Sequence, residues 1–265
     1  MKILVSGKGG VGKTTISALL SIIFSHNGYN VLALDTDSVP NLAQSLGIPM
    51  EEAEKIIPLA KNDELAEERT GARPGEGWGI LFSLTPKVDD IADKYGIKIN
   101  DNLKLVVVGS IDASKEGCLC PAIALAKAFL IHVMTSSREI IIVDSEAGAE
   151  VFGRGLAEKF DLNITVSEPT IKSLAIARKL IKMANELGVE NNILVLNKVV
   201  DEITAAQAVK RVFGEEKIEY HMVRYDPEIV KLEMLGKGLN GLDPNTRVFK
   251  DVKSLYEKIL RIKKS

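Results

Sequence analysis

The chain has 265 residues, of which 46% are hydrophobic and 26% charged, and its formal net charge is -2. A chain of this size and composition buries a large core, which excludes disorder, and its near-neutral charge argues against a general nucleic-acid-binding protein. No apolar run approaches the roughly 18 residues that cross a bilayer, and no signal-peptide pattern opens the sequence. We therefore expect a cytoplasmic protein with no nucleic-acid partner and no stable membrane insertion.

Short apolar runs recur along the chain and predict buried β-strands at residues 3–5, 31–34, 103–108, 140–143, 164–166 and 193–196. Because these runs do not alternate with polar residues, both faces of each strand should be buried, as in a mainly parallel sheet between helix layers. Helical patterns follow at 15–23 and at 171–187, where Gly188 fits a C-cap. The sequence thus predicts a doubly wound α/β fold, and with no linker-like stretch we expect residues 1–265 to form one domain.

Two segments depart from this alternation. Residues 47–102 are rich in acidic residues and proline and carry the only tryptophan, Trp78, so we interpret them as an insertion that is partly helical and partly irregular. Such an insertion is either a functional surface or lid, or simply a packed excursion. Residues 248–262 have the spacing of an amphipathic helix, which we expect to cover the sheet rather than to lie on a membrane surface.

A glycine-rich segment joins the first predicted strand to the first predicted helix and matches the P-loop pattern with the residues Gly7, Lys8, Gly9, Gly10, Val11, Gly12, Lys13, Thr14 and Thr15. Glycines let backbone N–H groups converge on phosphate oxygens, and the helix N-terminus adds partial positive charge. We expect Lys13 to reach the β- and γ-phosphates and the Thr14 hydroxyl to ligate Mg²⁺. The alternative is a glycine turn that only packs strand against helix.

Carboxylates follow two other predicted strands. Asp144 ends the run 140–143 and should supply a second group for Mg²⁺ at the carboxyl end of a strand, with the Gly148 N–H near the γ-phosphate. Asp35 and Asp37 follow the run 31–34, and residues two apart in extended backbone point to the same side. Both carboxylates could therefore face one Mg²⁺ or one attacking water, although a polar turn after a strand is also an ordinary feature.

The two cysteines, Cys118 and Cys120, are separated by one residue, too close for a useful disulfide. Pro121 suits the first position of a helix over 122–133, which would place Cys120 near the N-cap, where the macrodipole favours the thiolate. One pair cannot complete a four-coordinate site, but a symmetric dimer would bring four thiolates together for Zn²⁺ or Ni²⁺. Alternatively, the two thiols pack as small buried hydrophobic groups.

The motif that begins at Lys8 is similar to the deviant Walker A motif of the SIMIBI ATPases, which include MinD, ParA, the nitrogenase iron protein and the arsenical pump ATPase. The resemblance implies a homodimer with ATP or ADP between its subunits, in which Lys8 reaches the phosphates bound by the partner and Thr15 bonds the α-phosphate. It also implies that Asp37 positions the hydrolytic water and ligates Mg²⁺, and that Asp35 supports the first switch loop. Residues 144–148 would form the second switch loop.

The same resemblance implies two base-contacting segments, Asn197 with Lys198, and Tyr225 with Asp226 and Pro227. The second segment departs from the proline-first form that is common in the family.

A narrower resemblance rests on three strings, at residues 40–43, 67–72 and 116–121. The last, Glu-Gly-Cys-Leu-Cys-Pro, is the most specific. Together they resemble the CooC family of ATPases, which assist nickel insertion into carbon monoxide dehydrogenase. This implies an ATP-dependent metallochaperone that holds nickel, or zinc, through Cys118 and Cys120 of both subunits and has carbon monoxide dehydrogenase as its client. A MinD- or ParA-type positioning ATPase and an iron–sulfur carrier ATPase are the alternatives.

Overall fold

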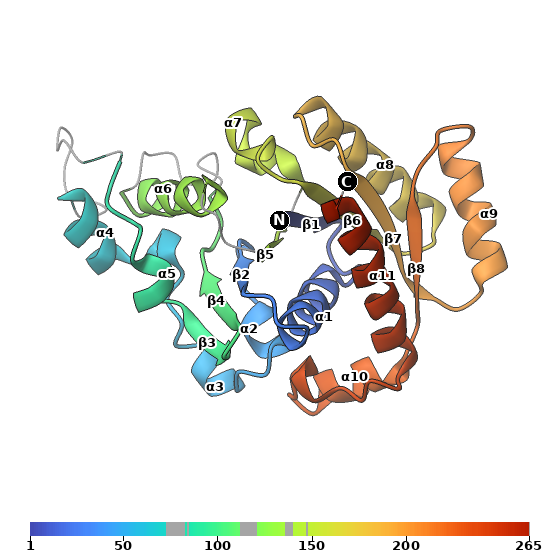
Figure 1. Ribbon diagram of the computed structural model, residues 1–265, viewed down its shortest axis with the longest axis horizontal. Coiled ribbons are helices and arrows are strands. Elements are labelled where there is room, and N and C mark those ends of the chain that lie inside the picture. Colours follow the sequence, from blue (N-terminus) through green and yellow to red (C-terminus); the bar gives the residue numbers. More distant parts are fainter. Residues whose placement is uncertain (73–82, 84, 112–120, 136–139, 147, 265) are drawn as a thin grey trace.

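The fold is organised around one sheet that runs through the molecule (Figure 1). The computed structural model describes residues 1–72, 83, 85–111, 121–135, 140–146 and 148–264. These residues form an eight-stranded sheet in the order β3-β4-β2-β5-β1-β6-β7-β8. The strands are β1 (Lys2–Gly7), β2 (Val31–Asp35), β3 (Ile97–Asn100), β4 (Leu103–Val107), β5 (Ile140–Asp144), β6 (Leu162–Ser167), β7 (Asn192–Val199) and β8 (Tyr220–Arg224).

All neighbouring strands pair in parallel except β3 and β4, which are antiparallel. The predicted mainly parallel sheet is therefore confirmed. The central strands β2 and β5 are buried at every position, which explains their uninterrupted apolar sequences. The edge strands β3 and β8 were not expected from the sequence, because both are largely exposed or half-buried and carry polar residues within them.

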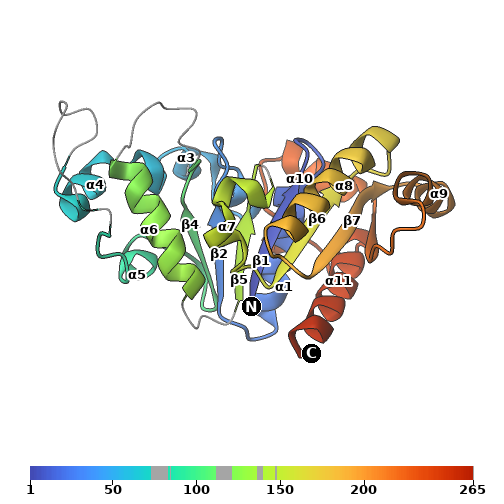
Figure 2. The same ribbon diagram turned by 90° about the horizontal axis from the view of Figure 1, so that it is seen from above.

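Helices cover both faces of the sheet. In the described residues they are α1 (Lys13–His26), α2 (Leu42–Ser45), α3 (Met50–Ala53), α4 (Asp63–Thr70), α5 (Ile91–Lys94), α6 (Pro121–Thr135), α7 (Arg154–Ala157), α8 (Ile171–Glu186), α9 (Glu202–Phe213), α10 (Pro227–Met234) and α11 (Arg247–Lys264), with short 3-10 turns η1 (Leu59–Lys61), η3 (Ala149–Phe152) and η4 (Leu239–Gly241). Helices α1 and α11 lie on one face, and α6, α7 and α8 lie on the other (Figures 1 and 2). None of the described helices combines the length and apolarity needed to cross a membrane.

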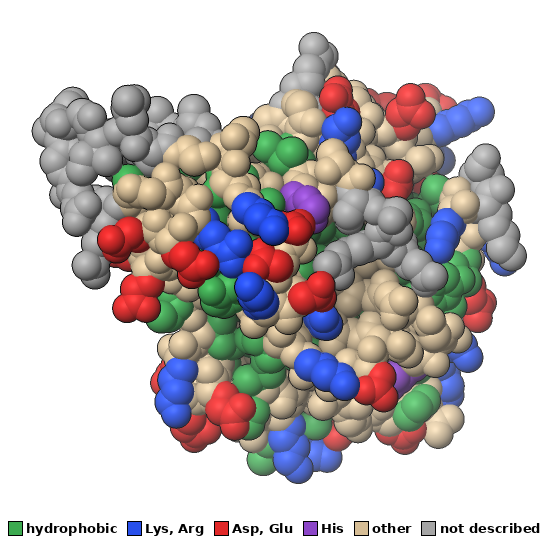
Figure 3. Space-filling view, turned by 60° about the vertical axis from the view of Figure 1, so that its left-hand side comes forward, with side chains coloured by type: hydrophobic (Ala, Val, Ile, Leu, Met, Phe, Trp, Pro, Cys, Tyr) green, Lys and Arg blue, Asp and Glu red, His purple; other side chains and the backbone are tan. Residues whose placement is uncertain are grey.

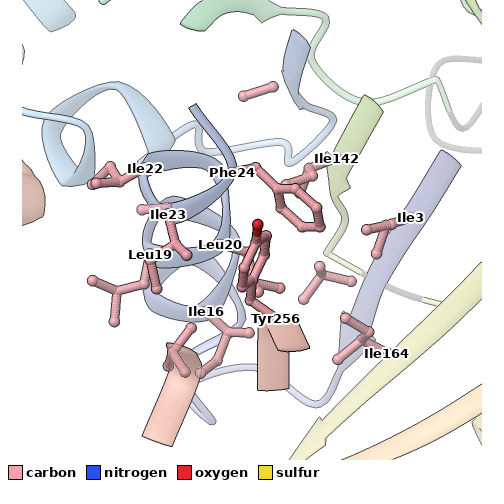
Figure 4. Close-up of a cluster of buried hydrophobic side chains, with 14 of the residues drawn as sticks. Ile3, Ile16, Leu19, Leu20, Ile22, Ile23, Phe24, Ile142, Ile164 and Tyr256 are labelled. Carbon is pink, nitrogen blue, oxygen red and sulfur yellow. The ribbon is translucent and has the colours of Figure 1, made fainter. Parts of the chain in front are cut away.

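One continuous apolar cluster fills the space between the sheet and the α1/α11 layer (Figure 4). Phe24 of α1 is fully buried and meets Tyr256 of α11 edge to face, with ring centroids 4.8 Å apart. The apolar side chains that define the stripe of α11 are buried here, namely Val248, Val252, Leu255, Tyr256 and Ile259. The expectation that this amphipathic helix covers the sheet is thus confirmed.

The described residues between 47 and 102 include the edge strand β3, and their helices α4 and α5 lie at the β3/β4 end of the sheet (Figure 1). Arg69 of α4 makes two hydrogen bonds to Asp90, at 3.0 and 2.9 Å, and Lys94 pairs with the same carboxylate at 2.8 Å. Acidic and basic side chains are interspersed over this part of the surface (Figure 3). Trp78 lies outside the described residues.

Replacing Phe24 with alanine should lower the free energy of unfolding by about 3–5 kcal/mol, because the substitution empties a fully buried site that α1 and α11 share. Urea denaturation monitored by circular dichroism measures this loss. Ile57→Ala, at a side chain that is 61% exposed, is the control and should change stability by less than about 0.5 kcal/mol. Equal losses in the two variants would contradict the assignment of this cluster as the core.

Candidate nucleotide-binding site

Three loops leave the carboxyl edge of the sheet side by side, because β5 lies between β2 and β1. Asp144 is the register partner of Asp35 on one side and of Val5 on the other. The residues that follow these three strands therefore begin at the same position along the sheet edge. They carry the P-loop, Asp37 and Gly148, which the sequence analysis assigned to one site.

The P-loop has an open backbone surface. Gly10 and Gly12 have left-handed φ angles of 81° and 94°, and a Cβ atom added at Gly9 or Gly10 would meet nothing within 4 Å. Within the described chain, the backbone N–H groups of Gly9, Gly10 and Gly12 donate no hydrogen bond. The loop therefore presents unpaired donors just before the N-terminus of α1, an arrangement suited to phosphate oxygens.

The two lysines of the motif lie differently. Lys13, in the first turn of α1, is only 7% exposed, and its Nζ donates back across the loop to the carbonyl oxygen of Lys8 at 3.4 Å. Lys8 itself is exposed. One cation is thus held over the loop, whereas the other projects from it.

Asp144 is a buried carboxylate, 2% exposed, that faces α1. Its Oδ1 accepts a hydrogen bond from Ser17 Oγ at 3.1 Å, and the Thr14 hydroxyl lies near enough to this carboxylate to favour its charged form. Burial, together with the neighbouring charge of Asp35, raises the pKa of Asp144 to about 7, although these hydroxyls and Lys13 oppose the rise. Carboxylate and hydroxyl oxygens are ligands that Mg²⁺ prefers, and a cation would favour the charged carboxylate, so these residues fit Mg²⁺.

Asp35 is oriented differently from the sequence-based expectation. Its buried carboxylate accepts the backbone N–H groups of Asp37, Asn41 and Leu42 at 3.1, 3.0 and 2.9 Å, and so holds the loop that leads into α2. Burial raises the pKa of Asp35 to about 6 despite these donors. The expectation that Asp35 and Asp37 face one cation or water is therefore not met, because β2 ends at Asp35 and the alternation of an extended strand does not continue past it.

Asp37 lies in the loop, half-buried, with Oδ1 accepting the N–H of Val39 at 3.1 Å. The same loop is tied to the one after β5. The N–H and Oγ1 of Thr36 both donate to the carbonyl oxygen of Asp144, at 2.9 and 2.8 Å, and Ser38 Oγ donates to Glu146 at 2.7 Å. These links were not anticipated, because no local pattern pairs residues more than a hundred positions apart.

A cavity of about 220 Å³ opens beside the P-loop. Its lining comes from four segments, with Gly10, Gly12, Thr15, Asn197, Lys198, Arg224, Tyr225, Asp226, Ile229, Val230, Glu233 and Val248. The structure thus brings Asn197, Lys198 and Asp226 together beside Thr15, whereas Pro227 does not line the cavity. Arg224 and Glu233 were missed by the sequence analysis, since only the pairing of β8 with β7 and the packing of α10 place them here.

Two side chains from the end of β7 hold the P-loop. Asn197 Nδ2 donates to the carbonyl oxygen of Val11 at 2.8 Å, and a Cβ atom at Gly12 would lie 2.3 Å from that same nitrogen. Lys198, which has a φ of 58°, donates through Nζ to the carbonyl oxygen of Gly10 and to Glu168, at 2.8 and 2.9 Å. The P-loop and the cavity wall are therefore directly connected.

Asp226 has a structural role in the cavity wall. Its Oδ1 accepts the N–H of Glu228 at 3.1 Å and its Oδ2 accepts the N–H of Arg247 at 2.9 Å, so one carboxylate caps α10 and reaches the first residue of α11. Pro227 takes the first position of α10. Both residues shape the cavity chiefly by fixing where these helices start.

Cys118 and Cys120 lie outside the described residues. Pro121 begins α6, as predicted. Among the residues that are described, no three His, Cys, Asp or Glu side chains gather as a metal ion would require. The intersubunit cysteine site therefore stays a prediction.

An open glycine loop between a buried strand and a helix, with a buried lysine and a carboxylate at the next strand end, defines a P-loop nucleotide-binding protein. Residues 2–239 match the family model described as the CobQ/CobB/MinD/ParA nucleotide-binding domain. The chain belongs to this family.

Relatives extend over nearly the whole chain. An uncharacterised ATP-binding protein of Methanocaldococcus jannaschii is 42% identical over an alignment of 265 positions that covers 99% of each chain. The carbon monoxide dehydrogenase accessory protein CooC of Rhodospirillum rubrum is 39% identical over 247 residues, covering 93% of this chain and 92% of that protein. The solved structure of MinD from Pyrococcus horikoshii, complexed with Mg-ADP, has the same fold, with a TM-score of 0.66 and 22% identity over 97% of this chain and 94% of that one.

Asp144→Asn should make stability less sensitive to pH when divalent cations are absent. Because the folded-state pKa of Asp144 is about 7 and the ordinary value is 3.8, the folded state binds this proton more tightly, and stability is lost as pH rises from about 4 to 7. The variant cannot ionise, so its unfolding free energy relative to the wild type should increase by about 3 kcal/mol across this window. Chemical denaturation in EDTA at several pH values measures the difference.

Asp89→Asn, at an exposed carboxylate, is the matched control and should show a difference from the wild type that does not depend on pH. A pH-independent difference for Asp144→Asn as well would show that burial of this carboxylate does not perturb its ionisation.

Proposed function

We propose that residues 1–265 form a single ATPase domain that hydrolyses ATP to ADP and phosphate as a homodimer, and that it is a metallochaperone assisting nickel insertion into carbon monoxide dehydrogenase. The observation that carries the ATPase proposal is the open P-loop beside the buried carboxylate Asp144. The similarity to CooC over 93% of the chain supports the maturation role. The Glu-Gly-Cys-Leu-Cys-Pro string supplies the candidate metal ligands.

Within one subunit, the P-loop N–H groups and Lys13 would hold the phosphates, and the Gly148 N–H would lie toward the γ-phosphate. Thr14, Asp37 and Asp144 are the residues that we assign to Mg²⁺, which when bound neutralises phosphate charge. The cavity beside Thr15 would take the base, with Asn197 and Lys198 joining it to the loop.

ATP hydrolysis needs side chains placed where negative charge develops in the transition state. Asp37 would orient the attacking water, while Asp35 keeps the surrounding loop in place through its three backbone hydrogen bonds. Lys8 is exposed, and its ammonium group forms no hydrogen bond or ion pair with the described residues. It is therefore available to phosphates held by a second subunit. Positive charge delivered in this way stabilises the transition state more than the bound substrate.

Metal handling would follow from the dimer. If two α6 N-termini meet near a two-fold axis, Cys118 and Cys120 of both subunits supply four thiolates to Ni²⁺, or to Zn²⁺. Loops that respond to the γ-phosphate, after Asp35 and after Asp144, would couple the nucleotide to this site.

The alternative function, a membrane-positioning ATPase, would need an amphipathic helix free to lie on a membrane surface. The apolar face of α11 is instead buried against the rest of the chain, which weakens this alternative.

Lys8→Ala should retain nucleotide affinity but lose ATP hydrolysis by on the order of 10³-fold, because it removes only the charge supplied across the dimer. Lys13→Ala is the matched comparison and should weaken nucleotide binding itself, since Lys13 lies over its own loop. Fluorescent-nucleotide titration and phosphate release measure the two properties. Unchanged turnover in Lys8→Ala would exclude the cross-subunit role.

Replacing both Cys118 and Cys120 with serine should abolish metal-dependent dimerisation while leaving ATP binding intact. Gel filtration with nickel or zinc, combined with metal analysis, should give one metal ion per two chains for the wild type and none for the variant. Equal metal content and equal dimerisation would exclude the cysteine site. A brown, oxygen-labile chromophore on anaerobic purification would instead favour the iron–sulfur carrier.

A further inference from the structure

Helix α1 carries a stripe of buried serines at a spacing of four residues, and the residues between them are all apolar. Ser17, Ser21 and Ser25 are all buried, yet their hydroxyls have different targets. Ser21 Oγ donates to the carbonyl oxygen of Ser17 at 2.7 Å, and Ser25 Oγ donates to that of Ile22 at 2.9 Å, so both donate within their own helix. Only Ser17 donates to another element, the Asp144 carboxylate at 3.1 Å.

The position of Ser17 follows from helix geometry. Residue 17 is one turn after Lys13 and three residues after Thr14, so these side chains share the face of α1 that looks toward the carboxyl end of β5. Ser17 hydrogen-bonds the Asp144 carboxylate, and the Thr14 hydroxyl lies near the same carboxylate. The main chain of Asp144 is fixed independently, because its carbonyl oxygen accepts two hydrogen bonds from Thr36.

The proposed function assigns the Thr14 hydroxyl to Mg²⁺, which leaves Ser17 as the side-chain donor that can still hold the Asp144 carboxylate. We infer that Ser17 is a positioning residue, whose hydroxyl fixes the buried carboxylate of Asp144 in the orientation that serves the Mg²⁺ of the bound nucleotide. This inference rests on the proposed nucleotide site. Ser17 itself touches neither nucleotide nor cation, and acts through Asp144.

The test compares ADP binding in EDTA with ADP binding in Mg²⁺, by calorimetry, for the wild type, Ser17→Ala and Ser21→Ala. ADP is used so that hydrolysis does not contribute. Ser17→Ala should keep its affinity in EDTA and lose about tenfold of the affinity that Mg²⁺ adds, the size expected for one hydrogen bond to a charged group. Ser21→Ala removes a buried hydroxyl of the same helix and should match the wild type in both conditions.

Ser17→Thr keeps a hydroxyl and should retain the Mg²⁺ dependence of the wild type. The inference is overturned if Ser17→Ala responds to Mg²⁺ as the wild type does, if it loses affinity equally in EDTA and in Mg²⁺, or if Ser17→Thr behaves as Ser17→Ala. Failure of the proposed nucleotide site would be seen separately, as a wild type that does not bind ADP in either condition.

Discussion

The carboxyl edge of the sheet is built around two carboxylates buried on neighbouring strands, Asp35 and Asp144. They are register partners, and burial raises the pKa of each. A buried carboxylate is stable only when hydrogen-bond donors or a cation surround it, so this pair determines which groups must lie next to the ends of β2 and β5. Backbone N–H groups of the loop into α2 donate to Asp35, and the Ser17 hydroxyl of α1 donates to Asp144.

This division gives the two carboxylates different tasks. Asp35 is enclosed by its own loop and acts as an architectural group, whereas Asp144 is held from one side by side chains of α1 and lies next to the P-loop. The main chain of Asp144 also anchors Thr36, so the loop after β2 is tied to the strand that bears the second carboxylate. A shift of Asp144 would therefore also move the loop that carries Asp37.

The sequence was sufficient for features that depend on local pattern. Uninterrupted apolar runs identified the strands buried on both faces, and glycine spacing located the P-loop. Features that depend on long-range pairing were not accessible: strands β3 and β8 carry the mixed sequences of sheet edges, and Arg224 joins the cavity only because β8 lies beside β7. The orientation of Asp35 was misjudged because strand alternation was extended one step past the end of β2. Cys118 and Cys120 lie outside the described residues, so the structure does not add to that part of the prediction.

The contacts of Asn197 and Lys198 with the P-loop carbonyl groups have a further consequence. They join the phosphate loop directly to the wall of the neighbouring cavity, and a methyl group at Gly12 would collide with the Asn197 amide. These two hydrogen bonds fix the separation between the phosphate loop and the cavity wall in the unliganded chain. For a nucleotide bound as proposed, that separation would favour molecules whose base and phosphates are the same distance apart.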